Sequence, residues 1–219
     1  METISRREAA SLLLAGAAAA ALPALGAESS RRIALPPPRK TGGMSLVEAL
    51  SKRRSMREFS PRPLEPQALS NLLWAAYGIN RASGDRTAPC WRHVQAIEVY
   101  AAMADGLWLY EPKEHALLAR GSEDIRALTG VQDFVATAPL NLVYVAHGER
   151  MRDVSPEERR LYASVDAAVI AENAYLACAG EGLATVLRAS LDPRKLAQAM
   201  RVDADAIVTF AQSVGYPPA

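Results

Sequence analysis

The sequence predicts an α+β fold in which a mixed β-sheet is flanked by helices and one long central helix is buried. Helical and strand patterns interleave along the chain without a regular β-α-β rhythm. Residues 140–146 form a largely apolar run, which is typical of a strand covered on both faces. Residues 156–179 contain no glycine, and no proline after the first position, which favours a single long helix.

Composition indicates one globular domain and argues against a polyanionic partner. The chain has 219 residues, of which 50% are hydrophobic and 22% charged, so it can bury one sizeable core. Its 25 basic and 24 acidic residues give a net charge of +1, so no overall field would attract nucleic acid. Cys90 and Cys178 do not form a C-x-x-C pair, and the three histidines lack metal-ligand spacing. We therefore expect neither a metal site nor a disulfide scaffold.

The first 26 residues have the pattern of an export signal. Arg6 and Arg7 precede an alanine-rich apolar run, residues 12–25, which is less apolar than a membrane-spanning helix. Residues 24–26 offer a small-x-small cleavage site. The paired arginines favour export by the twin-arginine translocase, and therefore a periplasmic protein. The alternatives are an ordinary secretory signal and an uncleaved membrane anchor.

Residues 27–43 are rich in Ser, Arg and Pro, and the three prolines at residues 36–38 favour an extended conformation. We expect this segment to be a tether outside the fold. The predicted organisation is therefore a twin-arginine signal peptide over residues 1–26, a linker over residues 27–43 and one folded domain over residues 44–219.

Two helices are predicted at the start of the domain. Ser45 and Glu48 form a capping box, so a helix should start at Ser45 and run towards the basic residues 52–54. Pro66 suits the first turn of a second helix, which should end at Gly78. The inward-facing apolar residues of this second helix repeat at helical spacing: Leu69, Leu72, Leu73 and Ala76.

The middle of the domain predicts strands. Residues 95–100 alternate as a strand, and residues 107–110 and 115–118, on either side of a turn, predict a hairpin that we place at the periphery. The apolar residues 140–146 are the candidate for the central strand.

The last part of the chain predicts the long helix and two further strands. Residues 156–179 are apolar on nearly all sides of a helix, which predicts deep burial. Residues 183–187 then form a short strand, and residues 207–214 form the last one. Between them, Asp192 is the N-cap and Pro193 the first position of another helix.

Residues 53–57 are the first candidate site. They contain Arg53, Arg54, Ser55 and Arg57, which puts three guanidinium groups and a hydroxyl at the end of a helix. Arginine forks suit the bidentate geometry of a phosphate, and the hydroxyl can hydrogen-bond the polar edge of a heterocycle. On composition alone, a solvated basic face is the simpler alternative.

The loop over residues 86–95 is the second candidate, because it leads directly into a strand. It contains Pro89, Cys90 and His93, and such a loop can present backbone groups and short side chains to a planar ligand. Together the two candidates resemble the FMN-binding segments of the nitroreductase family, an R-R-S-x-R element after the first helix and a T-A-P-S-x-x-N-x-Q loop before a strand. The similarity extends over residues 44–217 and is closest to the thiazole-oxidase-like (SagB-type) dehydrogenase branch.

The resemblance implies a homodimer with two FMN sites at the subunit interface. It implies that Arg53, Ser55 and Arg57 meet the FMN phosphate, ribityl chain and ring edge. Many members of the family carry further basic residues for the phosphate near the C-terminal end. Here Arg54 or Arg188 is the candidate source of that charge.

The resemblance also implies how the flavin ring is held. Pro89, Cys90 and His93 would line the ring, although Cys90 stands where the family usually has serine and His93 where it usually has asparagine. Three further residues match the segment beside the isoalloxazine, where a backbone amide can meet flavin N5: Leu187, Arg188 and Ala189.

In this family the flavin carries the redox chemistry, so the resemblance implies an enzyme without a catalytic side chain. The expected function is an FMN-dependent oxidoreductase that passes a hydride through FMN N5 between a donor and a small nitroaromatic or quinone acceptor, or that works as a dehydrogenase. Because nicotinamide cofactors are cytoplasmic, an exported member would need another reductant. The alternatives are a flavin-binding protein without turnover and a flavin-free interaction protein of the cell envelope.

Overall fold

The structure, a computed structural model, describes residues 31–218. The predicted signal peptide lies outside the described residues and stays a prediction. Among the helices of residues 31–218, none combines the length and the hydropathy that crossing a bilayer requires.

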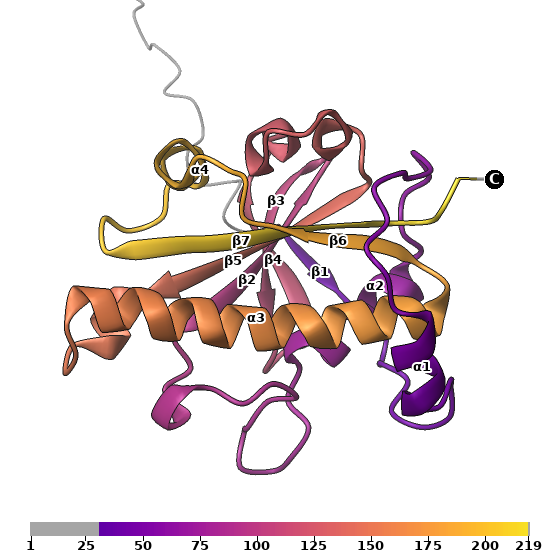
Figure 1. The fold of residues 1–219 in the computed structure, drawn as a ribbon, viewed down its shortest axis with the longest axis horizontal. Coiled ribbons are helices and arrows are strands. Elements are labelled where there is room, and N and C mark those ends of the chain that lie inside the picture. Colours follow the sequence, from indigo (N-terminus) through magenta and orange to yellow (C-terminus); the bar gives the residue numbers. More distant parts are fainter. Residues whose placement is uncertain (1–30, 219) are drawn as a thin grey trace, which may run out of the picture.

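The described chain forms a seven-stranded sheet with the strand order β1-β4-β3-β2-β5-β7-β6 (Figure 1). The α+β class is confirmed, but every strand pairing in this part of the chain is antiparallel, whereas we expected a mixed sheet. The strands are β1 (Arg32–Ala34), β2 (Ile97–Met103), β3 (Gly106–Glu111), β4 (Ala116–Gly121), β5 (Leu140–His147), β6 (Ala184–Arg188) and β7 (Ala206–Gly215).

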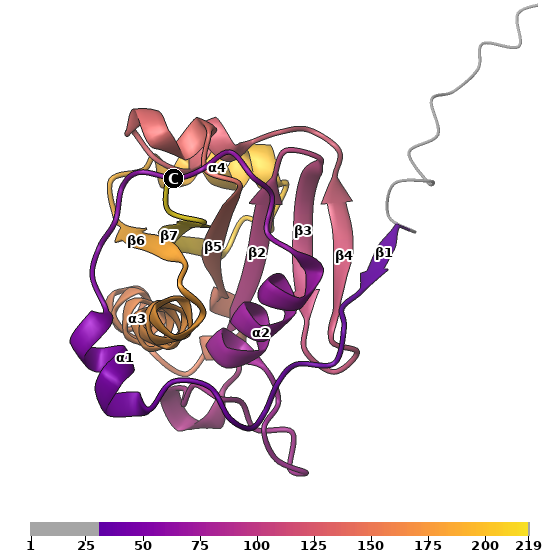
Figure 2. The same cartoon turned by 90° about the vertical axis from the view of Figure 1, so that its right-hand side faces the viewer.

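Helices lie on both faces of this sheet (Figure 1, Figure 2). Helices α2 and α3 pack on one face, whereas α4 and the short 3-10 segments η3 and η4 lie on the other. The helices are α1 (Leu46–Lys52), α2 (Pro66–Tyr77), α3 (Pro156–Glu181) and α4 (Pro193–Met200). The 3-10 segments are η2 (Trp91–His93), η3 (Arg126–Thr129), η4 (Asp133–Ala136) and η5 (Gly148–Met151).

The predicted helix boundaries are confirmed, because the capping residues bind the free backbone groups at the helix ends. Ser45 accepts the backbone N–H of Glu48 at the start of α1, and Asp192 accepts two backbone N–H groups at the start of α4. Helix α3 ends at Gly182, whose φ of 70° is a left-handed conformation that glycine adopts without strain.

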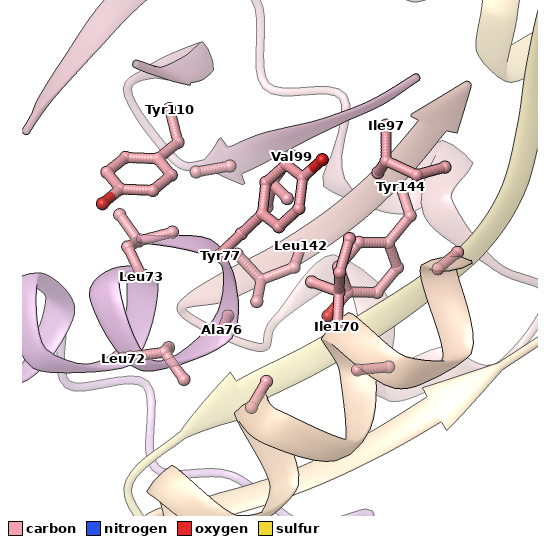
Figure 3. Close-up of a cluster of buried hydrophobic side chains, with 14 of the residues drawn as sticks. Leu72, Leu73, Ala76, Tyr77, Ile97, Val99, Tyr110, Leu142, Tyr144 and Ile170 are labelled. Carbon is pink, nitrogen blue, oxygen red and sulfur yellow. The ribbon is translucent and has the colours of Figure 1, made fainter. Parts of the chain in front are cut away.

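Strand β5 is an interior strand of the sheet, between β2 and β7, and all of its residues are buried, as the apolar run predicted. Its side chains alternate between two cores: Leu142 and Tyr144 face α2 and α3 (Figure 3), whereas Val143 and Val145 face α4. Burying a side chain of this size contributes about 1.5–3 kcal/mol. The strand therefore joins the two halves of the hydrophobic core.

The predicted tether is wrong in its described part, because residues 32–38 are attached to the domain. Strand β1 pairs with β4, and the Leu35 N–H donates to the His115 carbonyl at 3.1 Å. The Ser70 hydroxyl donates to the Pro36 carbonyl and lies 2.7 Å from Nε2 of His115. None of the three residues of β1 is a proline, so their N–H groups can pair as an edge strand where proline could not.

The predicted hairpin is confirmed, but its peripheral position is wrong. Strands β3 and β4 lie between β1 and β2 in the sheet, and the side chains of Trp108 and Leu117 are almost fully buried. Because β1 covers the outer edge of β4, the hairpin becomes part of the core.

Helix α3 is long and central, but it is not buried on all sides. Its buried residues form one face against the sheet and α2, whereas Leu161 is 58% and Val165 is 51% exposed. An apolar side of a helix predicts that something packs against it, but that need not be another part of the same chain. The all-round apolar pattern therefore overestimates how much of α3 one chain buries.

Replacing Leu142 with alanine should lower the free energy of unfolding by about 2–5 kcal/mol, because it leaves a cavity in a fully buried position. The matched change Leu128→Ala, at an exposed position of η3, should lower it by less than about 1 kcal/mol. Urea unfolding followed by circular dichroism, at one protein concentration, measures both. Equal losses in the two variants would contradict the buried, interior position of β5.

Candidate functional site

Residues 53–57 leave the end of α1 and run along the outer edge of β6. The Met56 N–H donates to the Thr185 carbonyl at 2.9 Å, which fixes this segment to the strand. Within residues 31–218, Arg53, Arg54 and Arg57 form no ion pair with a carboxylate. Their three guanidinium groups are therefore available to an anionic ligand.

Tyr175 of α3 joins this arginine-rich segment to β6. Its hydroxyl lies 2.9 Å from Oγ of Ser55 and accepts the backbone N–H of Leu187 at 2.8 Å. The guanidinium of Arg53 lies 5.3 Å from the centroid of the Tyr175 ring, which is a cation–π distance. The structure thus brings together Ser55 and Leu187, which were predicted from separate segments.

A pocket of about 320 Å³ opens beside this junction. Its volume lies within the range of about 300–1,000 Å³ that is usual for small-molecule and cofactor sites. Arg54, Met56 and Thr185 line it, together with Tyr175 and with Pro217 from the C-terminal segment. A cationic residue beside a partly apolar wall suits a ligand with an anionic group and a planar apolar part.

The loop over residues 89–93 is held by α3 at a different place. The Trp91 N–H donates to both carboxylate oxygens of Asp166, each at 3.1 Å. The Trp91 ring stacks on Tyr162 with the ring centroids 4.9 Å apart. Burial raises the pKa of Asp166, although the hydrogen bond from Trp91 opposes this shift.

Cys90 and His93 share this loop, but their side chains form no hydrogen bond with each other in the described chain. His93 is 92% exposed, and its Nδ1 lies 3.9 Å from Asp85. Burial, and then the neighbouring Asp166, raise the pKa of the Cys90 thiol. The thiol therefore stays protonated near neutral pH, which fits a contact residue better than a nucleophile. Pro89 is exposed at the start of the loop.

The predicted residues therefore fall into two groups along α3. Tyr175 holds the group with Ser55 and Leu187, and Asp166 holds the loop. The two helix residues lie about 14 Å apart along the axis, at ~1.5 Å per residue. A single chain does not bring the arginine-rich segment and the loop together.

Arg188 is buried, and its side chain points to the sheet face that α4 covers, away from the pocket. Its guanidinium donates to the Thr129 carbonyl at 2.6 Å, and to Oδ1 of Asn141 and Oγ of Ser213 at 3.1 Å each. Burial lowers the pKa of Arg188 to about 10. Because these partners engage the guanidinium, the geometry favours Arg54 over Arg188 as a further charge for a phosphate.

Asp166 and Tyr175 have site roles that the sequence pattern did not reveal. Both are polar residues on the buried face of a helix whose other inward residues are mostly apolar. Buried polar groups nearly always have a partner. Their inward position was therefore the signal that each of them binds another segment.

Comparison with known proteins points to one family. The model of the nitroreductase family matches residues 50–216. A protein of Methanocaldococcus jannaschii that is described as a candidate nitroreductase is 32% identical over 153 residues, which cover 65% of this chain and 77% of that protein.

Solved structures show the same fold. The crystal structure of a candidate nitroreductase from Ralstonia eutropha has a TM-score of 0.83 and 43% identity, and the match covers 87% of this chain and 91% of that one. The NADPH:FMN oxidoreductase of Vibrio harveyi, solved in complex with NAD+, has a TM-score of 0.57 and 20% identity, with 80% and 69% covered. At this lower identity, the likeness shows the fold alone.

Asp166 should be replaceable by asparagine but not by alanine. Asparagine keeps an acceptor for the Trp91 N–H and removes a buried charge, so Asp166→Asn should keep or raise the free energy of unfolding at pH 7. Asp166→Ala should lower it by about 1–3 kcal/mol, because the Trp91 N–H loses its acceptor. Urea unfolding of the three proteins measures the difference, and an alanine variant as stable as the asparagine variant would contradict this role.

Asp166 should also make stability depend on pH with a known sign. Because its pKa is raised in the folded state, the folded carboxyl binds a proton more tightly than the unfolded one. Stability should therefore fall as pH rises from the unfolded pKa of ~3.9 towards the higher folded pKa. The Asp166→Asn variant should lack this pH dependence of the free energy of unfolding. Parallel curves of stability against pH for wild type and variant would therefore contradict the role of Asp166.

Proposed function

This chain belongs to the nitroreductase family and is an oxidoreductase of that family, and on this premise we propose that it binds FMN, works as a homodimer and acts in the periplasm. The observation that carries the cofactor assignment is the junction of Arg53, Ser55 and Leu187 on Tyr175, beside a pocket of about 320 Å³.

The cationic side of this junction fits the phosphate of FMN. Arg53, Arg54 and Arg57 have no carboxylate partner in the described chain, and planar guanidinium forks suit phosphate oxygens. The Ser55 hydroxyl, which hydrogen-bonds the Tyr175 hydroxyl, is our candidate partner for the ribityl chain or the edge of the ring. These side chains bind and orient the cofactor and neutralise its charge.

The end of β6 fits the flavin ring. The Leu187 N–H is already donated to Tyr175, and Arg188 is the last residue of β6 that pairs with β7. The amide of Ala189, just beyond the paired strand, is therefore our candidate for the hydrogen bond to flavin N5. When bound there, FMN supplies hydride transfer at N5, and the chain supplies binding, orientation and electrostatics.

The substrate is a small molecule in this proposal. A hydride passes through the flavin between a donor and an acceptor of the nitroaromatic or quinone type, or the protein works as a dehydrogenase like the thiazole-oxidase branch. Cys90 contributes a protonated thiol that contacts the ring rather than attacking a substrate, because its pKa is raised.

The exposed side of α3 supports a homodimer. Leu161 and Val165 are large apolar residues in contact with solvent, and Ala168 continues the same exposed stripe. Uncovered apolar stripes of this kind mark protein–protein interfaces. A second copy of the same chain is the partner that the family resemblance implies.

A two-fold dimer through α3 would also complete the site. In one chain, the loop over residues 89–93 and the segment over residues 53–57 contact different parts of α3. A two-fold axis perpendicular to the helix reverses the direction of the second copy. The loop of one protomer would then lie beside the arginine-rich segment of its partner, and each flavin would contact both.

The leader supports the location. Paired arginines before a moderately apolar run favour the twin-arginine translocase, which carries folded proteins, so the domain would be exported with its cofactor in place. The physiological electron donor would then be a molecule of the cell envelope rather than a cytoplasmic nicotinamide.

Binding of FMN to the purified protein tests the cofactor assignment. Arg53→Gln and Arg57→Gln should each raise the Kd for FMN about tenfold or more, because each removes a charged hydrogen bond to the phosphate. The control is Arg194→Gln, which removes the same charge from an exposed position of α4 and should leave the Kd unchanged. Flavin fluorescence titration measures all four proteins.

Each alternative predicts a different result of that experiment. An equal loss of FMN affinity in Arg194→Gln would mean that the titration reports the overall charge of the protein and not a phosphate site. A protein that neither carries FMN nor takes it up would be the flavin-free interaction protein. A flavin that no hydride donor bleaches under anaerobic conditions would indicate a flavin-binding protein without turnover.

Val165→Arg should convert the dimer to a monomer and weaken FMN binding, because it places a charge in the proposed interface. Leu128→Arg, at another exposed apolar position, should change neither property. Analytical ultracentrifugation measures the mass in solution. A monomeric wild type that binds FMN tightly would contradict the shared site.

A further inference from the structure

A wedge-shaped opening separates β2 from β3 at one end of the sheet. The pairing of the two strands ends at Tyr100↔Leu109, although β2 continues to pair with β5 as far as Ile97. Residues 97–99 of β2 and 110–111 of β3 lie beyond this last residue pair, on the two sides of the opening, which we call the wedge.

The backbone of β2 directs polar groups into the wedge. The Ala96 carbonyl accepts the N–H of His147, and backbone groups alternate between the two sides of a strand. The N–H and C=O groups of Ile97 therefore point towards β3, beyond the last residue pair of the β2–β3 register. Peptide groups at the open end of a strand ladder can form hydrogen bonds with a ligand or with water.

The wedge contains a cavity of about 210 Å³. Ile97 and Val99 line it on one side and Tyr110 on the other, with Arg86 and Lys113 at its margin. This volume is below the range of about 300–1,000 Å³ that drug-sized ligands need, so it suits a small molecule. The cavity shares no lining residue with the pocket beside Tyr175.

The Tyr77 hydroxyl is buried at this cavity without a partner. Tyr77 is 2% exposed, lines the cavity, and has no hydrogen-bond partner for its hydroxyl in the described chain. Its ring extends from the end of α2 past Val99, with the hydroxyl directed towards the Ile97 side of β2 (Figure 3). An unpaired buried hydroxyl is destabilising and calls for an acceptor. Burial raises the pKa of Tyr77 to about 12, so the hydroxyl remains a donor at neutral pH.

Two cations at the wedge have no acidic partner in the described chain. The guanidinium of Arg86 lies 4.5 Å from the Tyr77 ring centroid and donates to neutral oxygens, Oε1 of Gln95 at 2.9 Å and the Tyr77 carbonyl at 3.4 Å. The Lys113 ammonium forms no ion pair within residues 31–218.

The acidic groups of the wedge leave one positive charge uncompensated. Glu98 and Arg150 neutralise each other at 2.8 Å. Glu111 brings one negative charge, and its carboxylate accepts the backbone N–H of Lys113 at 2.9 Å. Against Arg86 and Lys113, this leaves a net charge of +1, which matches a monoanion.

We propose that the wedge is a binding site for a small monocarboxylate. The carboxylate accepts the hydrogen bond of the Tyr77 hydroxyl, and Arg86 and Lys113 supply the electrostatic attraction. The short apolar part of the ligand lies against Ile97 and Val99. This cavity is separate from the pocket beside Tyr175, although Arg86 belongs to the loop over residues 86–95.

Propionate is the probe, and isothermal titration calorimetry measures its Kd, expected on the order of 1 mM. Tyr77→Phe should raise this Kd about tenfold or more, because it removes the donor to a charged acceptor. The fold should not suffer, since the deleted hydroxyl has no partner. The control Tyr162→Phe removes a tyrosine hydroxyl outside the wedge and should leave the Kd unchanged. Lys113→Gln, at an exposed position, should weaken binding and reduce its dependence on salt.

Two further probes distinguish a carboxylate from other occupants. Propionamide has a similar size without the charge and should bind at least about tenfold more weakly than propionate. Inorganic phosphate should bind more weakly than propionate because of its second charge. Equal binding of propionamide, tighter binding of phosphate, or an unchanged Kd in Tyr77→Phe would overturn the proposal. Crystals grown with propionate that show only water in the wedge would overturn it as well.

Discussion

The packing of α3 against the sheet is the constraint on which the rest of the site depends. The buried face of the helix is mostly apolar, but it carries Asp166 and Tyr175, which cannot stay unpartnered there. The Asp166 carboxylate accepts the backbone N–H of Trp91. The Tyr175 hydroxyl hydrogen-bonds the Ser55 hydroxyl and accepts the N–H of Leu187. The helix therefore sets the spacing between the loop and the arginine-rich segment, and any ligand that contacts both must conform to it.

Most of the fold could be predicted because its signals are local. The caps at Ser45 and Asp192, the helical spacing in α2 and the apolar run of β5 each depend on residues within a few positions. The pairing of β1 with β4 depends on residues far along the chain, so composition alone suggested a tether. The exposed side of α3 could not be predicted either, because an apolar pattern does not say which of its residues the rest of the chain covers.

The site could be predicted by segment but not by side chain. The family pattern placed Ser55 and Leu187 near one ligand, and the structure joins them at Tyr175. The family pattern did not show that the side chains of Leu187 and Arg188 face opposite sides of the sheet. This arrangement follows from the alternation of side chains along a strand. The acceptors that bind the Arg188 guanidinium come from three other elements, so no local pattern could reveal them.

The three residues of β1 shield the outer edge of the sheet from pairing with another chain. They cover the outer edge of β4, and an uncovered strand edge is a template on which another chain can add. A protein shortened to begin at Met44 would keep the helices and both proposed sites. It would also expose the backbone of β4 and leave Ser70 without the Pro36 carbonyl, so the cost of removing this apparent linker would be aggregation rather than loss of chemistry.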